Sequence, residues 1–283
     1  MSFPPFFGGL PFTGRQAGKK LNWLLAAGEI RQLLTGVYVA ADMPDTTELR
    51  ASAATLVIPA NAVACGETAA WIHGIPTTAL SPADTVPLRW KNTPTDVVEL
   101  AGVKVTSPIA TGVELALHLP RPFALSAVDA LLRSGRADRA ALEAMLDDYA
   151  GHRGELQARH IFKYADGRAE SPGESWLRLR LIDAGFGRPE LQVRVKAAQR
   201  EYRVDLGYPK PVDGRRLGLE YDSDRWHSRD RQKARDGERR ADLAGVGWHI
   251  ISVQRTDVWG SYPALELAVG DFLCQWPRLP RRW

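Results

Sequence analysis

The chain has few cysteines and no long hydrophobic run. Among its 283 residues the only cysteines are Cys65 and Cys274, which lie too far apart in sequence to suggest a metal-ligand motif. Two scattered thiols favour a reducing compartment over a disulfide-stabilised secreted fold. The apolar start, residues 1–10, has no basic segment and is too short to cross a bilayer. We therefore expect a cytoplasmic protein without a signal peptide or a membrane span.

Charge of one sign is not strongly in excess either. The net charge is +4, the isoelectric point is near 9.1, and apolar residues make up 45% of the chain. This composition is typical of a soluble globular protein, and it permits an anionic partner without requiring one. The length suits two or three modules with sizeable cores. Because residues 1–168 contain no nucleophile–base pair and no phosphate-binding loop, we look for chemistry in the second half.

Residues 1–45 predict a small helix followed by a hairpin. Apolar spacing favours a helix over 15–27, and two strand-like runs then meet at a Thr35-Gly36 turn. A helix followed by a small basic hairpin is typical of the end of a winged helix, in which the helix enters a DNA groove. Alternatively, the basic residues of this segment are solvated surface charges on a small helix and hairpin with no role in DNA binding. The candidates for phosphate contact are Arg15, Lys19, Lys20 and Arg31.

Residues 46–168 predict a mixed α/β segment followed by helices. A helix is expected over 47–57, and strands over 85–90 and 97–105, the second turned at Ala101-Gly102. From 108 onward the apolar spacing becomes helical. The helices expected there span 109–118, 123–133, 139–149 and 155–164.

The third segment, residues 169–283, opens with a capped helix. Ser171 at the N-cap, Pro172 at the first helical position and Glu174 three residues after the cap form a capping-box pattern. Capping is a complete structural explanation for Glu174. However, Glu174 shares a helical face with Leu177 and Leu181, so its carboxylate could also face a sheet. The pattern leaves both roles open.

Acidic residues interrupt two of the four strands expected next, over 191–196, 202–206, 217–222 and 248–253. Asp205 lies within an apolar strand, and Glu220 and Asp222 share one face of the following strand. Such carboxylates cost free energy unless a cation or an arginine offsets them. Mg²⁺ or Mn²⁺ prefers oxygen ligands of this kind. His227 follows closely and, with an ordinary pKa of about 6.5, could act as an acid or a base.

A highly charged helix is expected over 228–244. Arg231, Arg235 and Arg239 recur at every fourth position and so share one face, where they could bind a phosphodiester backbone. Acidic residues are interspersed, so a solvated helix with internal ion pairs is an equally physical explanation. The candidates for nucleic-acid contact in this segment are Arg229, Arg231, Lys233, Arg235 and Arg239.

Two resemblances follow from these segments. Residues 32–39, followed by 64–75, resemble antitoxins of the abortive-infection class of type IV toxin–antitoxin systems. That resemblance implies an operator-binding winged helix and a cognate toxin as partner. Residues 171–258 resemble the PD-(D/E)xK restriction-endonuclease-like fold, in the branch related to very-short-patch-repair endonucleases. This second resemblance implies that Asp205 and Glu220 bind the metal, with Glu174 as an accessory acid.

One departure from the second pattern is informative. Asp222 stands where the fold usually has a lysine. In the resembling branch that lysine is also absent and a histidine after the strand assists catalysis, a role that His227 would take here. We therefore predict an α/β multidomain protein: an N-terminal winged helix, an α+β and helical middle region, and a restriction-endonuclease-like core with a mixed sheet.

The predicted function is a metal-dependent DNA endonuclease or nickase in phage defence or a toxin–antitoxin setting. The alternative is a DNA-binding regulator or antitoxin with an inert nuclease-like domain, and a third possibility is a module that neutralises a toxin through the charged helix. Adjacent carboxylates of Asp205 and Glu220, with His227 nearby, would favour the enzyme. An arginine in that space, with Arg203 or Arg178 as candidates, would favour the inert protein.

Overall fold

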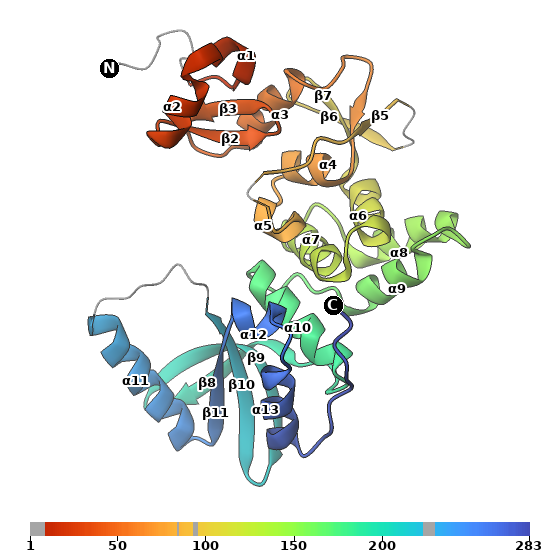
Figure 1. Cartoon of the computed structure of the whole chain (residues 1–283). Coiled ribbons are helices and arrows are strands. Elements are labelled where there is room, and N and C mark those ends of the chain that lie inside the picture. Colours follow the sequence, from red (N-terminus) through yellow and green to blue (C-terminus); the bar gives the residue numbers. More distant parts are fainter. Residues whose placement is uncertain (1–8, 84, 93–95, 223–229) are drawn as a thin grey trace. The chain divides into compact units, whose positions relative to one another are not determined.

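The computed structural model describes residues 9–83, 85–92, 96–222 and 230–283, and the side chains of 230–236 lie outside the description. The chain divides into two compact units, an N-terminal unit (Met1–Ala165) and a C-terminal unit (Asp166–Trp283). Their elements are labelled in Figure 1. Among the described residues, no helix is both long and apolar enough to cross a membrane.

The N-terminal unit begins with a three-stranded antiparallel sheet of order β1-β3-β2 beside short helices. The predicted hairpin is confirmed, because Gly36 (φ 79°) turns the chain between its strands. The predicted helix over 15–27 is divided instead, since Gly18 in the left-handed region (φ 56°) ends its first turn. The elements are β1 (Phe12–Thr13), α1 (Gly14–Ala17), a 3-10 turn (Gly18–Lys20), α2 (Leu21–Ala26), β2 (Ile30–Leu34) and β3 (Val37–Ala40).

A small four-stranded sheet of order β5-β4-β7-β6 follows. The predicted hairpin at 97–105 is confirmed, with Ala101 and Gly102 both at positive φ in its turn. The strand predicted over 85–90 is wrong in extent, because only Trp90 and Lys91 pair as a strand there, opposite β4. The elements are α3 (Thr47–Thr55), β4 (Val63–Ala64), α4 (Gly66–Ile72), α5 (Thr77–Leu80), β5 (Trp90–Lys91), β6 (Val97–Leu100) and β7 (Val103–Thr106).

Helices complete the N-terminal unit and confirm the predicted helical segment. They pack closely: a Cβ on Gly112 of α6 would lie 2.7 Å from Leu142 Cδ2 of α8. The elements are α6 (Pro108–His118), α7 (Arg121–Arg133), α8 (Arg139–Leu146), a 3-10 turn (Asp147–Tyr149) and α9 (Glu155–Tyr164).

The C-terminal unit is built on a mixed four-stranded sheet of order β11-β10-β9-β8. β10 and β11 are parallel and joined through α11, whereas β8, β9 and β10 are antiparallel neighbours. This arrangement confirms the predicted mixed sheet. The elements are α10 (Pro172–Asp183), β8 (Glu190–Ala197), β9 (Arg200–Val212), β10 (Arg215–Asp222), α11 (Asp230–Gly245), β11 (Trp248–Gln254), α12 (Arg255–Trp259) and α13 (Ala264–Leu273).

Helices cover both faces of this sheet (Figure 1). On one face, Leu243 of α11 packs with Val204 and Trp248, and a Cβ on Gly218 of β10 would reach into the same cluster. On the other face, Gly173 of α10 lies against the ring of Tyr221. Tyr221 and Gly218 are three residues apart on β10 and therefore point to opposite faces. The end of β10 is thus enclosed between α10 and α11.

Candidate functional site

Two of the predicted acids meet where β9 and β10 separate. Among the described residues, the last paired positions of this ladder are Leu219 and Leu206, and the next residues along the two strands are Glu220 and Asp205. Beyond the last pair, the backbone N–H of Tyr221 donates to Asp205 Oδ2 at 3.1 Å. The Asp205 side chain therefore takes a donor that the end of the ladder leaves available.

Glu174 joins them from the first turn of α10. The predicted N-cap is present, with Ser171 Oγ accepting from the Glu174 N–H at 3.2 Å, and Glu174 returns to the cap by accepting from the Ser171 hydroxyl at 2.9 Å, not from the N-cap backbone N–H of a standard capping box. The backbone N–H of Glu170 donates to Glu174 Oε2 at 2.9 Å. In addition, Gln192 Nε2 of β8 donates to Oε2 at 2.8 Å, which ties the cap to the sheet. Capping of this helix is confirmed, and a functional role for Glu174 stays a prediction.

The charges of the other two acids act on Asp205. Burial, together with the negative charges of Glu174 and Glu220, raises the pKa of Asp205 to about 6, against the opposing effects of the Tyr221 N–H and Arg239. Burial also raises the pKa of Glu174, although its three hydrogen bonds act in the other direction. A divalent cation would offset this concentration of negative charge.

An arginine occupies part of this space. Arg239 of α11 forms a close two-pronged ion pair with the carboxylate of Glu220, and its Nη2 also donates to the carbonyl oxygen of Arg203 at 2.7 Å. It is neither of the arginines that the sequence suggested. Arg203 pairs with Glu170 at 2.7 Å, and Arg178 is fully buried within α10. Arg239 was predicted to bind phosphate, and that role stays a prediction beside its observed internal partner.

Two other predicted catalytic residues, Asp222 and His227, add little to the description of the site. Asp222 is exposed at the end of β10, opposite Gln254 of β11. His227 and Arg229 lie outside the described residues, so the predicted contribution of His227 has no structural test. In the described part of the chain, no group of three or more His, Cys, Asp or Glu side chains is arranged to hold a metal ion.

The predicted phosphate contacts divide into two groups. In the N-terminal unit, Arg15, Lys19 and Lys20 are exposed, whereas Arg31 is half-buried and donates to the carbonyl oxygen of Met43 at 2.9 Å. On α11, the side chains of Arg231, Lys233 and Arg235 lie outside the description.

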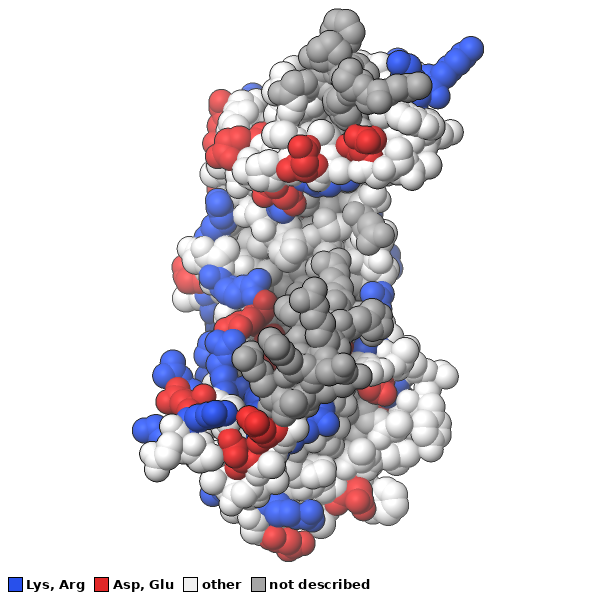
Figure 2. Space-filling view, turned by 90° about the vertical axis from the view of Figure 1, so that its left-hand side faces the viewer, with Lys and Arg blue, Asp and Glu red and all other residues white. Residues whose placement is uncertain are grey.

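The described end of α11 directs its charges to its own sheet. Arg240 donates to Ser252 Oγ at 2.6 Å, and the Tyr202 hydroxyl donates to Asp242. On the face drawn in Figure 2, basic and acidic side chains alternate over the C-terminal unit. The described side chains on this face therefore carry both signs of charge.

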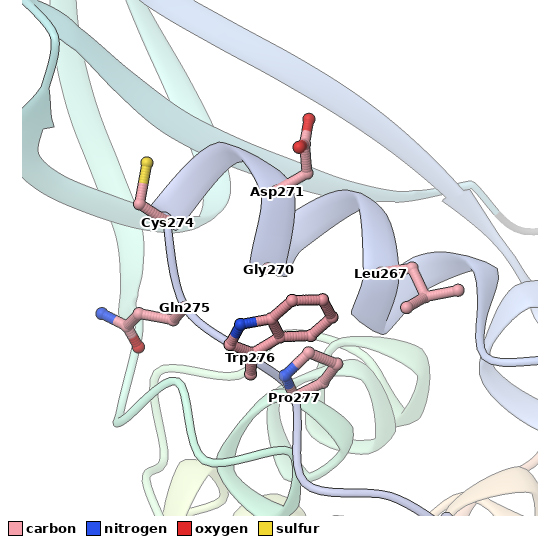
Figure 3. Close-up of a pocket in the computed structure, with 7 residues that line it drawn as sticks. All are labelled: Leu267, Gly270, Asp271, Cys274, Gln275, Trp276 and Pro277. Atoms are coloured by element: carbon pink, nitrogen blue, oxygen red, sulfur yellow. The ribbon is translucent and has the colours of Figure 1, made fainter.

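A separate groove runs along α13. It has a volume of about 540 Å³ and lies between that helix and the segment that follows it. Figure 3 shows the Trp276 ring beside Pro277, with Asp271 and Cys274 pointing to the other side of the helix. The site acids Glu174, Asp205 and Glu220 do not line this groove.

Gln192 is the member of the site that sequence patterns did not reveal. Strand alternation grouped it with Arg194 and Lys196 as an outward polar residue. In the structure its backbone is left-handed (φ 54°), and its amide reaches Glu174. The only hint in the sequence is that Gln192 is neutral whereas Arg194 and Lys196 are charged, which is weak evidence for a functional role.

Comparisons with known proteins agree with this architecture. A family model described as the AbiEi antitoxin C-terminal domain matches residues 78–164, and a restriction-endonuclease-like model, REase_MTES_1575, matches residues 179–267. Two Mycobacterium tuberculosis proteins, Uncharacterized protein MT2308 and Uncharacterized protein Rv2248, are each 35% identical to this chain over 252 residues, which cover 85% of this chain and 91% of theirs. No solved structure matches.

Proposed function

Because this chain belongs to the family of these mycobacterial proteins and joins an AbiEi antitoxin-like region to a restriction-endonuclease-like domain, we propose that it is a metal-dependent DNA endonuclease or nickase. The observation that carries the proposal is the convergence of Glu174, Asp205 and Glu220 where β9 and β10 separate. The setting that fits an antitoxin-like region is phage defence or a toxin–antitoxin pair.

The carboxylates of this site have the donor chemistry that a hard divalent cation prefers. Asp205 and Glu220 would hold Mg²⁺ or Mn²⁺, with Glu174 as an accessory acid, because carboxylate oxygens are the ligands such ions prefer. Burial and the neighbouring carboxylates raise the pKa of Asp205, and a raised pKa of this kind supports a functional role for the carboxyl group. When bound, the cation supplies charge neutralisation at the phosphate and lowers the pKa of a water.

The chain's own residues would supply the remaining functions. Arg239 forms an ion pair with Glu220. If Glu220 were to bind a cation, the guanidinium of Arg239 could bind a phosphate oxygen instead, which would reconcile its observed and predicted roles. His227 is the proposed acid or base, and Asp222 occupies the place of the usual lysine.

The N-terminal unit is proposed to bind DNA through a winged helix. Its support is the small antiparallel sheet β1-β3-β2 beside α1 and α2, held by a core of Phe12, Leu24 and Ile30. Exposed Arg15, Lys19 and Lys20 supply the positive charge that phosphates require.

A second function has one observation in its favour. The Arg239–Glu220 ion pair places an arginine against a proposed metal ligand, as in a purely structural site. Under this alternative the protein is a DNA-binding regulator or antitoxin, and its nuclease-like domain is inert.

A nicking assay on supercoiled plasmid separates the two functions. With Mg²⁺ or Mn²⁺ the wild type should convert supercoiled to open-circular DNA, and chelator should stop it. Asp205→Asn and Glu220→Gln should each lower the rate by at least about 100-fold. The matched control Asp213→Asn, an exposed acid in the β9–β10 turn, should behave as wild type. DNA binding without cleavage, or cleavage indifferent to both site variants, would reject the enzyme.

A further inference from the structure

Gln192 has an unusual backbone for a residue within a strand. Its neighbours pair regularly with β9, Leu191 with Leu206 and Val193 with Val204, so Gln192 lies opposite Asp205. Yet its φ is 54°, in the left-handed region that residues with a Cβ avoid. A strained conformation of this kind persists only where the surroundings enforce it, and such conformations cluster at functional sites.

The side chain of Gln192 is also incompletely satisfied. Its Nε2 donates to Glu174 Oε2 at 2.8 Å. Its Oε1 is buried and has no hydrogen-bond partner among the described residues. A buried carbonyl oxygen without a donor is unfavourable, and each such group in a folded protein calls for an explanation.

Support of the helix cap does not explain this residue. Glu174 is already held by Ser171 Oγ and by the N–H of Glu170, so the N-terminus of α10 is capped without a contact from β8. A glutamine that only filled space would gain nothing from a left-handed backbone. The geometry instead directs its amide specifically to one of the three site acids.

We propose that Gln192 is a positioning residue of the acidic site, which fixes the Glu174 carboxylate and offers Oε1 to the water shell of a divalent cation. The inference rests on the proposed function, because it assumes that the site takes a cation. Mg²⁺ keeps several of its waters when proteins bind it, and those waters donate hydrogen bonds. A neutral amide oxygen accepts such a bond without adding negative charge beside three carboxylates.

The test measures cation binding by the full chain without relying on cleavage. Thermal unfolding is followed in chelator and then at rising Mg²⁺ or Mn²⁺, and the midpoint of the stabilisation gives an apparent affinity. Gln192→Met keeps the length of the side chain and removes both amide groups. Gln192→Gly removes the side chain and the left-handed strain, so a foldable variant remains if the first one fails to fold.

A second glutamine provides the matched control. Gln199 is also left-handed (φ 63°), but it is exposed in the turn between β8 and β9. Gln199→Gly should leave the apparent cation affinity unchanged, whereas both Gln192 variants should weaken it by about 10-fold, the effect typical of groups that orient metal ligands.

The outcomes separate this inference from the proposed function. If the Gln192 variants shift the melting temperature in chelator and leave the cation midpoint at the wild-type value, the residue is structural and the inference fails alone. If the wild type itself shows no stabilisation by either cation, both the inference and the metal-dependent function fail.

Discussion

Two sites, one in each unit, treat buried charge in opposite ways. In the N-terminal unit, buried Arg50 donates to both carboxylate oxygens of Asp45, at 2.8 and 2.7 Å, and to the carbonyl oxygens of Trp71 and Ile75. Its hydrogen bonds lower the pKa of Asp45. At the acidic site of the C-terminal unit, Arg239 forms its ion pair with Glu220, whereas burial and the neighbouring carboxylates raise the pKa of Asp205.

This contrast separates a site that stabilises a fold from one that is suited to a ligand. A compensated buried charge is complete without anything added. A cluster of like charges is unfavourable until a cation arrives, and perturbed carboxyl groups of this kind mark functional sites. Each of the following experiments changes one side of the comparison.

The largest expected effect on stability comes from removing Arg50, the buried arginine whose charge Asp45 compensates. Arg50→Ala would leave Asp45 and two carbonyl oxygens without their donor, and we expect a loss of about 3–5 kcal/mol in the free energy of unfolding, measured with denaturant. Arg159→Ala, which removes an arginine from surface ion pairs in the same unit, should cost far less stability. Equal losses of unfolding free energy from the two variants would show that the buried Arg50 site stabilises the fold no more than a surface ion pair does.

Substitution of Asp205 is expected to stabilise the protein instead. Because folding raises its pKa from 3.8 to about 6, the unfavourable contribution is absent below pH 3.8, grows as pH rises, and is complete above pH 6. Asp205→Asn should therefore stabilise the protein by up to about 3 kcal/mol at pH 7 and by little at pH 4. Urea unfolding at several pH values measures this. A variant less stable than wild type at pH 7 would contradict it.

Releasing Glu220 should give an intermediate effect. Arg239→Gln removes the ion pair, so the protein in chelator should lose about 1–2 kcal/mol of stability. Added Mg²⁺ should restore more stability to this variant than to wild type, because Glu220 no longer has to leave a partner. Calorimetric or thermal titration with the cation measures the difference. An identical response in both proteins would show that Glu220 is not a ligand.

The smallest effect on stability is expected at the N-terminal basic residues. Arg15→Ala, Lys19→Ala and Lys20→Ala should each change stability by less than about 0.5 kcal/mol. Each lost phosphate contact should lower the salt dependence of DNA binding by about 0.9 in the logarithmic slope. Lys104→Ala, an exposed lysine on β7, is the control. An unchanged slope in all three variants would argue against a DNA-binding role for this surface.

Local patterns predicted the C-terminal sheet well. Alternation in β8, β9 and β10 and the apolar run of β11 located the strands, because each strand buries at least one face. The acids Asp205 and Glu220 were found because charge is unusual within such runs. The capping box at Ser171 and Glu174 was found because its spacing is fixed by the geometry of one helical turn.

The missed features depend on contacts that are distant in sequence. Arg239 pairs with Glu220 across nineteen positions, and helical spacing suggests partners only within one turn. The left-handed backbone of Gln192 is imposed by its surroundings, since glutamine has no preference for it. The division of the first helix at Gly18 could have been predicted from that glycine, which weakens a helix interior.

Gly173, which carries no charge, determines how closely α10 can approach β10 at this site. A Cβ at this position would lie 2.1 Å from the Tyr221 ring, so the contact between α10 and β10 exists only because the residue is glycine. The adjacent Glu174 is carried on the same turn. The substitution Gly173→Ala would therefore push α10 away from β10. The Glu174 carboxylate would move away from Asp205, although no acid would be changed chemically. The distance between an acid on a helix and an acid on a sheet is set here by the absence of a side chain.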